Sequence, residues 1–172
     1  MNFKILTTTI ILFAIISQSR AQNVNQQVEH IQKVVKEIDS ANFEKKLFTY
    51  NNKCGVIKAT IAIYYENDSV RKITDTGLGD DDKAAAKWAY KYYYENGKLI
   101  FSSESISGAD DEGKQYNNEK TEYLSSNNVV KRIENGKTIY PKKEVINSSD
   151  SRYKLTMVKS SSDIRQIYNC EN

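Results

Sequence analysis

The sequence predicts an α+β protein in which one N-terminal helix packs on an antiparallel β-meander of repeated hairpins. Three observations favour this fold: an apolar leader, a helical period of apolar residues after it, and alternating segments joined by Asn-Gly and Asn-Asp turns. The chain has 172 residues, enough for one domain that buries a hydrophobic core. We therefore expect a single domain behind a removable leader.

The leader occupies residues 1–21. A short basic start precedes an apolar run at residues 5–16, and Ser19 and Ala21 supply the small side chains of a cleavage site before Gln22. The apolar run is shorter than the roughly 20 residues that a membrane span requires. We therefore expect cleavage, no membrane span afterwards, and a periplasmic or secreted protein.

The mature domain, residues 22–172, is almost neutral. Two of the 25 basic residues lie in the leader, which contains none of the 22 acidic residues, so the mature chain carries a net charge of 23 minus 22, or +1. Nucleic acid is not an expected partner, because phosphate binding favours a strongly basic face. The 12 tyrosines are typical of strands whose rings pack while their hydroxyls reach water.

Residues 23–48 are expected to contain the helix. Apolar residues recur there at spacings of three and four, which gives one apolar seam. The spacing also fits a coiled coil, but it lasts only about two heptads, so a helix lying on the sheet is preferred. The only histidine, His30, flanks the seam without a metal or triad motif near it. The seam consists of Val24, Val28, Ile31, Val35 and Ile38.

The strongest hairpin signal is the dipeptide at residues 96–97, Asn-Gly. Both residue types accept the positive φ angles of a type I′ turn, which fixes the pairing of the flanking residues. Weaker copies of this hairpin occupy residues 64–70 and 132–139. The expected pairs are Glu95 with Lys98, Tyr94 with Leu99, and Tyr92 with Phe101.

Alternating segments before and after this hairpin predict the other strands. Polar loops are expected at residues 75–82 and 108–113, and Pro141 is expected to end the meander. The tail from Asn147 fits either helix or extended chain. The remaining strands are expected at residues 57–65, 70–74, 115–124, 129–133 and 137–140.

The two-residue period of a strand divides the central hairpin into two faces. One face, which we expect to lie under the helix, carries Trp88, Tyr92, Tyr94, Leu99 and Phe101. The opposite face carries Lys87, Lys91 and Tyr93, and it is the predicted binding surface for a protein, peptide or glycan. If the faces are reversed, an aromatic strip takes that role instead: Trp88, Tyr90, Tyr92 and Tyr94.

Two cysteines, Cys54 and Cys170, remain in the mature chain. An even cysteine count in an exported protein favours a disulfide between them. The long loop that it closes corresponds to a stabilisation of about 4–5 kcal/mol in the chain-entropy model. Two free buried thiols and a metal pair are the alternatives, although a single histidine leaves a metal pair short of soft ligands.

A calcium site is the only cofactor hypothesis that the loops raise. Four carboxylates beside glycines could supply hard oxygen ligands: Asp75, Asp80, Asp81 and Asp82. Their spacing does not match a helix-loop-helix calcium loop, and solvated carboxylates are the alternative. No cofactor is therefore assigned.

Catalytic motifs are missing from the sequence. It contains no Gly-x-Ser-x-Gly, His-Glu-x-x-His or phosphate-binding glycine loop. The carboxylates that a glycosidase could use, Glu66, Glu95 and Glu134, all lie beside predicted turns. We therefore expect a non-catalytic binding module, with a structural envelope protein that self-associates through sheet edges as the alternative.

The order of these elements resembles small exported β-meander proteins of unknown function from Gram-negative bacteria. The resemblance covers most of residues 55–139 and depends on the Cys-Gly strand, the acidic glycine loop and the Tyr-Tyr-x-Asn-Gly-x-Leu hairpin. A looser likeness is to MORN-type hairpin repeats. The copies here, however, lie 29 and then 39 residues apart, whereas that family has a short fixed period. Neither resemblance implies a functional residue.

Overall fold

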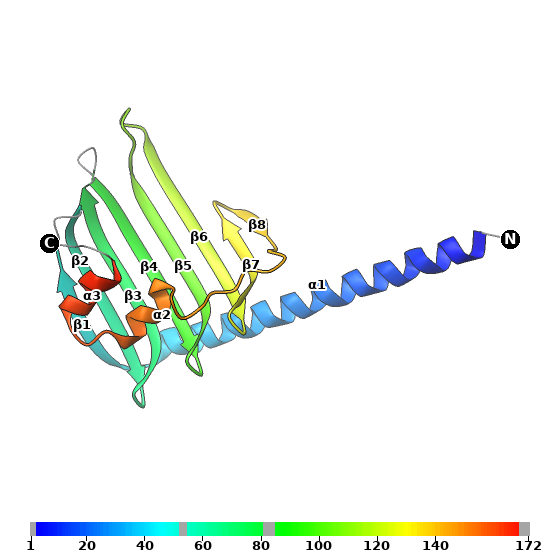
Figure 1. Ribbon diagram of the computed structural model, residues 1–172, viewed down its shortest axis with the longest axis horizontal. Coiled ribbons are helices and arrows are strands. Elements are labelled where there is room, and N and C mark those ends of the chain that lie inside the picture. Colours follow the sequence, from blue (N-terminus) through cyan, green and yellow to red (C-terminus); the bar gives the residue numbers. More distant parts are fainter. Residues whose placement is uncertain (1–2, 52–54, 81–84, 169–172) are drawn as a thin grey trace.

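The computed structural model describes residues 3–51, 55–80 and 85–168 (Figure 1). Helix α1 spans Phe3–Ser40, and a meander follows it, so the predicted α+β fold is confirmed. Among the described residues no helix is long and apolar enough to cross a membrane. The strands are β1 (Glu44–Tyr50), β2 (Val56–Glu66), β3 (Ser69–Asp80), β4 (Ala85–Glu95), β5 (Lys98–Ala109), β6 (Gln115–Ser125), β7 (Asn128–Glu134) and β8 (Lys137–Ile139).

The strands form one sheet in which each strand pairs antiparallel with its neighbours in the chain. Helix α1 lies on one side, which we call the back face, and the C-terminal segment lies on the other, the front face (Figure 1). Both layers cover the half of the sheet nearest the β2–β3, β4–β5 and β6–β7 turns, which we call the turn half. Helix α1 leaves the far half of the back face uncovered (Figure 1). On the front face Tyr168, which follows α3, reaches into the far half, where it contacts Tyr50 and Asp75. The C-terminal segment contains α2 (Ser151–Lys154), η1 (Leu155–Met157) and α3 (Ser161–Ile167).

Three equivalent turns define the repeat of hairpins along the chain. Each has two consecutive residues with positive φ, as a type I′ turn requires, and the turns follow each other at intervals of 29 and 30 residues. The predicted copy at residues 132–139 does form a hairpin, β7–β8. Its turn, however, lies at the opposite end of the strands from the three turns described here. The third turn lies between the strands predicted at residues 115–124 and 129–133, but its Ser-Asn pair was not identified as a copy of the hairpin. The three turns are Asn67–Asp68, Asn96–Gly97 and Ser126–Asn127.

A β-bulge follows each of these turns. In the central hairpin Tyr94 pairs with Leu99 and Glu95 with Lys98, as predicted. The predicted pairing of Tyr92 with Phe101 is wrong, because Ile100 adds an extra residue after the turn. Phe101 pairs with Tyr93 instead.

The two faces of the sheet are the reverse of the predicted arrangement. Tyr92, Tyr94 and Leu99 lie in the front core, where Leu155 and Ile164 of the C-terminal segment complete the packing. The prediction was wrong because the C-terminal segment forms a second apolar layer, so the turn half is apolar on both faces. Of the five residues expected under α1, Phe101 alone packs in the back core.

Helix α1 covers the back core with the predicted apolar seam. Ile31, Val34 and Ile38 are buried against Tyr93 and Tyr123 of the sheet. Val34 joins the seam although the sequence spacing favoured its neighbour, Val35, which is partly buried. This amphipathic stripe explains why the helix lies on the sheet.

One strand was missed and one loop boundary is wrong. The helix covers the predicted seam and ends at Ser40, but residues 44–50, which the sequence left without a strand, form the edge strand β1. The loop expected at residues 75–82 continues β3 as far as Asp80. In that strand Gly77 and Gly79 pair with β4, so these glycines are part of the sheet and not of a turn.

Candidate functional site

The predicted binding residues do not share one free surface. Lys87 and Lys91 are exposed on the back face, in the far half. Tyr93 is only 2% exposed, and its hydroxyl donates to both carboxylate oxygens of Asp39 in α1, at 3.0 and 3.1 Å. Burial first, and then Asp39, raise the pKa of this tyrosine. Tyr93 therefore holds α1 on the sheet and is not available to a ligand.

Asp75 lies apart from the acidic loop with which it was grouped as a calcium ligand. Its carboxylate is buried in the front face, where it accepts hydrogen bonds from Trp88 Nε1 at 2.9 Å and Tyr168 Oη at 2.5 Å. Burial raises its pKa and these two hydrogen bonds oppose that rise. The side chain of Asp80, and the whole of Asp81 and Asp82, are outside the described residues.

The predicted disulfide residues, Cys54 and Cys170, also lie outside the described residues. Their described neighbours are close in space: the rings of Tyr50 and Tyr168 stack with centroids 6.0 Å apart and an angle of 13°. The Cys54–Cys170 link remains a prediction.

Trp88 is the centre of the candidate site, on the far half of the front face. A Cβ atom added to Gly77 would lie 2.0 Å from a carbon of the Trp88 ring, and one added to Gly79 would lie 3.3 Å from it. The indole therefore rests on the bare backbone of β3. Its N–H is held by Asp75, so the ring has a fixed position.

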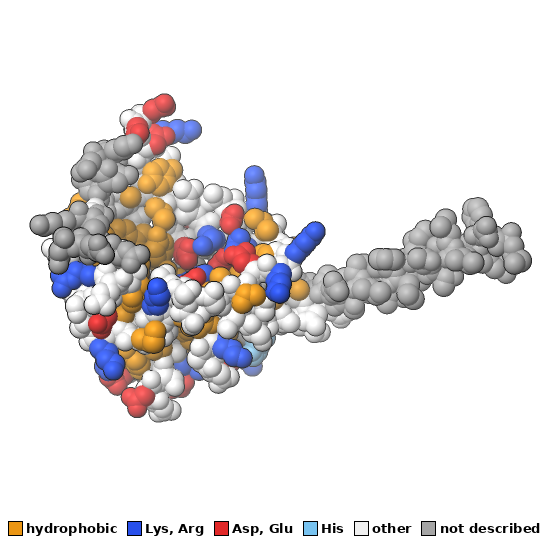
Figure 2. Space-filling model, viewed as in Figure 1, with side chains coloured by type: hydrophobic (Ala, Val, Ile, Leu, Met, Phe, Trp, Pro, Cys, Tyr) orange, Lys and Arg blue, Asp and Glu red, His pale blue; other side chains and the backbone are white. Residues whose placement is uncertain are grey.

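Tyr116 repeats this arrangement across the sheet. Its ring lies over Gly108 of the paired strand, where an added Cβ would meet the tyrosine hydroxyl at 2.7 Å. Ile106, 36% exposed, pairs with Trp88 on β4 and with Asn118 on β6. Figure 2 shows hydrophobic side chains gathered over this part of the front face. We call Trp88, Tyr90, Ile106 and Tyr116 the aromatic surface.

A row of polar side chains borders the aromatic surface. Tyr90 pairs with Glu104, and Glu104 pairs with Lys120, whose Nζ lies 2.7 Å from its carboxylate. Burial first, and then the charges of Glu104 and Asp75, raise the pKa of Tyr90 to about 12. This row therefore offers hydroxyl, carboxylate and ammonium groups beside the rings, with nearly balanced charge.

Beyond that row a buried ion-pair network anchors the C-terminal segment. Arg152 Nη1 lies 2.6 Å from Glu122 Oε2, and its Nε lies 2.8 Å from Asp150 Oδ1. Arg132 binds the other oxygen of Glu122 at 2.6 Å. Sequence reasoning missed this network, because its members come from separate strands and the tail and share no spacing.

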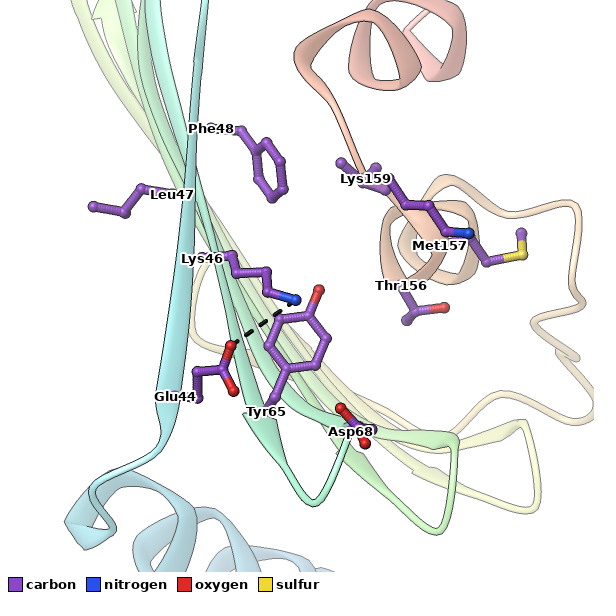
Figure 3. Close-up of a pocket in the computed structure, with 10 residues that line it drawn as sticks. Glu44, Lys46, Leu47, Phe48, Tyr65, Asp68, Thr156, Met157 and Lys159 are labelled. Atoms are coloured by element: carbon purple, nitrogen blue, oxygen red, sulfur yellow. Dashed lines mark ion pairs between the residues drawn. The ribbon is translucent and has the colours of Figure 1, made fainter.

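A groove of about 640 Å³ opens on the front face beside β1 (Figure 3). Phe48 and Tyr65 line its sheet side, and residues 156–159 form the opposite wall. Lys46 Nζ lies 4.8 Å from the centre of the Tyr65 ring and 3.9 Å from Glu44 Oε1. The groove combines an apolar floor with charges of both signs, but its rim is not built around fixed rings as the aromatic surface is.

Comparison of the chain with known proteins found no significant match. No protein-family model matches the chain, and no curated protein or solved structure matches it significantly. The resemblance to small exported β-meander proteins therefore remains a prediction.

Proposed function

We propose that the protein is an exported, non-catalytic binding module that holds a glycan against its aromatic surface. The observation that carries the proposal is the Trp88 ring, which lies on Gly77 and Gly79 and is fixed by Asp75. A side chain that is already held in place loses little conformational entropy when a ligand stacks on it.

The chemistry of the aromatic surface suits a sugar ring. A pyranose has apolar C–H faces and a rim of hydroxyls, so it needs a flat aromatic ring with hydrogen-bonding groups at its edge. Trp88 and Tyr116 supply the rings, and Asn118, Glu104 and Lys120 lie in the adjoining positions of the sheet.

A binding role is favoured over catalysis by the state of the nearby carboxylates. Glu104 is paired with Lys120, and Asp75 accepts two hydrogen bonds from aromatic side chains. Neither is presented to a ligand as a free acid or base of the kind that glycoside hydrolysis uses.

Trp88 is the single tryptophan of the chain, so its fluorescence reports directly on the site. We expect one or more of cellohexaose, maltohexaose and chitohexaose to change Trp88 emission saturably. Tyr116→Ala should weaken that binding roughly two- to 13-fold, as expected for about 0.5–1.5 kcal/mol per aromatic contact. Tyr140→Ala, at an exposed tyrosine outside the surface, is the control. If none of the three sugars binds, or if Tyr116→Ala leaves their affinity unchanged, the proposal is wrong.

Self-association through sheet edges is the weaker alternative. On β1, Lys45 and Lys46 are exposed, and Ser161 Oγ donates to the carbonyl of Thr49 at 3.1 Å. The opposite edge strand, β8, has three residues and is followed closely by Pro141. Lysines, short strands and covered edges all oppose strand addition. We expect one sedimentation coefficient, independent of concentration, whereas concentration-dependent oligomers would favour the alternative.

A further inference from the structure

The far half of the back face carries a second surface with a different chemistry. Helix α1 packs on the turn half, against Tyr93, Ile100 and Tyr123, and leaves the rest of this face uncovered (Figure 1). Strand alternation places basic and hydroxyl side chains there. We call this set the lysine–hydroxyl surface: Lys58, Thr60, Thr74, Thr76, Lys87, Lys91, Ser103, Ser105, Ser107 and Thr121.

The register spaces the three lysines regularly. Leu78 pairs with Lys58 on one side and with Lys87 on the other, so these lysines lie two strands, or about 10 Å, apart. Lys91 follows Lys87 on the same face four residues later, or roughly 13 Å along the strand. Thr76 and Leu78 of β3 lie between the lysines of β2 and β4, and the serines of β5 lie beside Lys87 and Lys91.

The charge of this surface is unbalanced although the whole protein is nearly neutral. Lys72 and Lys120 pair with carboxylates at 2.6 and 2.7 Å, but within the described part of the chain Lys58, Lys87 and Lys91 have no ion-pair partner. All three are exposed. One acidic residue, Glu119 on β6, lies in the same cross-strand rows as these lysines and hydroxyls. Its carboxylate accepts a hydrogen bond from the Asn117 side chain at 3.0 Å. An unpaired cationic patch of this kind attracts an anionic partner.

We infer that the lysine–hydroxyl surface binds an anionic polysaccharide. A flat sheet face accommodates an extended polymer, and same-face hydroxyls recur about every 7 Å along each strand. Serine and threonine hydroxyls both donate and accept, which matches sugar hydroxyls, while the lysines match carboxylate or sulfate groups. Single-stranded nucleic acid is disfavoured because it needs aromatic stacking, and Tyr93 and Tyr123 on this face are buried beneath α1.

The test uses alginate, a polyuronate, with neutral dextran as the uncharged comparison. The exported protein should bind immobilised alginate but not dextran. Its affinity should fall roughly 20- to 40-fold as salt rises from about 50 to about 200 mM, as expected when three lysines displace counterions. Lys87→Glu/Lys91→Glu should reduce alginate affinity at least about tenfold.

A matched double variant separates the surface from the total charge. Lys142→Glu/Lys143→Glu makes the same charge change at two exposed lysines beyond β8 and should leave alginate binding within about twofold. Equal losses in the two variants, equal binding to dextran, or tighter binding to single-stranded DNA would each overturn the inference. Trp88→Ala should retain alginate binding, so this test and that of the aromatic surface fail independently.

Discussion

The hydroxyl of Tyr94 donates a hydrogen bond of 2.6 Å to the main-chain carbonyl of Arg152, which lies 58 residues later in the chain. Both groups are buried, and the Tyr94 ring also meets the Tyr153 ring edge-on, with centroids 6.4 Å apart. The central hairpin is thereby fastened to the C-terminal segment, which makes that segment a structural layer of the domain.

Tyr94→Phe is expected to destabilise the protein by about 1–3 kcal/mol, because a buried carbonyl loses its donor while the ring remains. Urea unfolding measures the loss. Tyr140→Phe, at an exposed tyrosine, is the control and should stay within about 0.5 kcal/mol of the parent. Equal effects of the two changes would mean that the hydrogen bond contributes nothing.

Tyr92→Ala and Tyr93→Ala are each expected to cost about 3–5 kcal/mol, because the two rings point into different cores and both are buried. A sheet covered on one side only would tolerate one of these truncations. Urea melts of the two variants distinguish the cases. A cost below about 1 kcal/mol for either change would show that its layer does not pack as described.

Acid is expected to destabilise the protein through Glu122 and Asp150. Burial acts to raise the pKa of both carboxyls, but basic neighbours outweigh it: Lys120 first for Glu122, and hydrogen bonds from Arg152 for Asp150. Since the pKa is lowered in the folded state, the stabilisation is present above the unfolded values of 4.5 and 3.8 and is lost as pH falls through the folded ones. The raised pKa of Asp75 acts in the opposite sense, because its contribution is lost as pH rises.

Glu122→Gln isolates the contribution of Glu122 to this effect. At neutral pH it should cost up to about 3–5 kcal/mol, because it removes the buried carboxylate that Arg152 and Arg132 share, although Arg152 keeps its pairing with Asp150. Its free energy of unfolding should then fall less steeply than that of the parent below about pH 4.5. Urea midpoints across the acid range provide the measurement, and parallel curves would contradict the assignment.

Gly77→Ala is expected to displace the Trp88 ring, because the new Cβ would lie 2.0 Å from a ring carbon. The emission maximum and near-ultraviolet circular dichroism of Trp88 should both change. Thr76→Ala, at the neighbouring residue on the opposite face, should leave both signals unaltered. An unchanged Trp88 spectrum in Gly77→Ala would mean that the ring does not lie on β3.

Free-thiol titration under oxidising conditions is expected to find no reactive thiol, if Cys54 and Cys170 are linked as the sequence predicts. Reduction should then lower stability by up to about 4–5 kcal/mol, the chain-entropy value for a long loop. Cys54→Ser/Cys170→Ser is the control, because a reductant should not affect it. Two reactive thiols in the folded protein would exclude the link.

The antiparallel meander could be predicted because its signals are local. Asn96 and Gly97 fix a turn by their own backbone preferences, and the apolar seam of α1 repeats at helical spacing. Which face lies under α1 could not be predicted, because the C-terminal segment makes the other face apolar too. The pairing of Phe101 could not be predicted either, because Ile100 shifts the ladder by one position and no residue type marks a bulge in advance. The apolar residues of the tail, such as Leu155 and Ile164, lie in helices too short to show a period.

Part of the candidate site could likewise be predicted from the sequence, and part could not. Alternation predicted correctly that Lys87 and Lys91 share a face, and that Trp88 and Tyr90 share the other. It could not predict that Tyr93 lies under the helix, because that depends on how far α1 extends across the sheet. The aromatic strip considered for reversed faces is open only in part, since the C-terminal segment covers Tyr92 and Tyr94.

The return of the tail to the start of the sheet has a consequence for the order of assembly. Each strand pairs with its chain neighbour, so the sheet can form hairpin after hairpin along the chain. The front core forms only after the sheet, because it depends on contacts between distant parts of the chain. Ser161 contacts Thr49, 112 residues earlier, and Tyr168 contacts Asp75, 93 residues earlier. The segment that follows the sheet in the chain therefore closes the domain, and until it packs the front aromatic residues are exposed to chaperones and proteases.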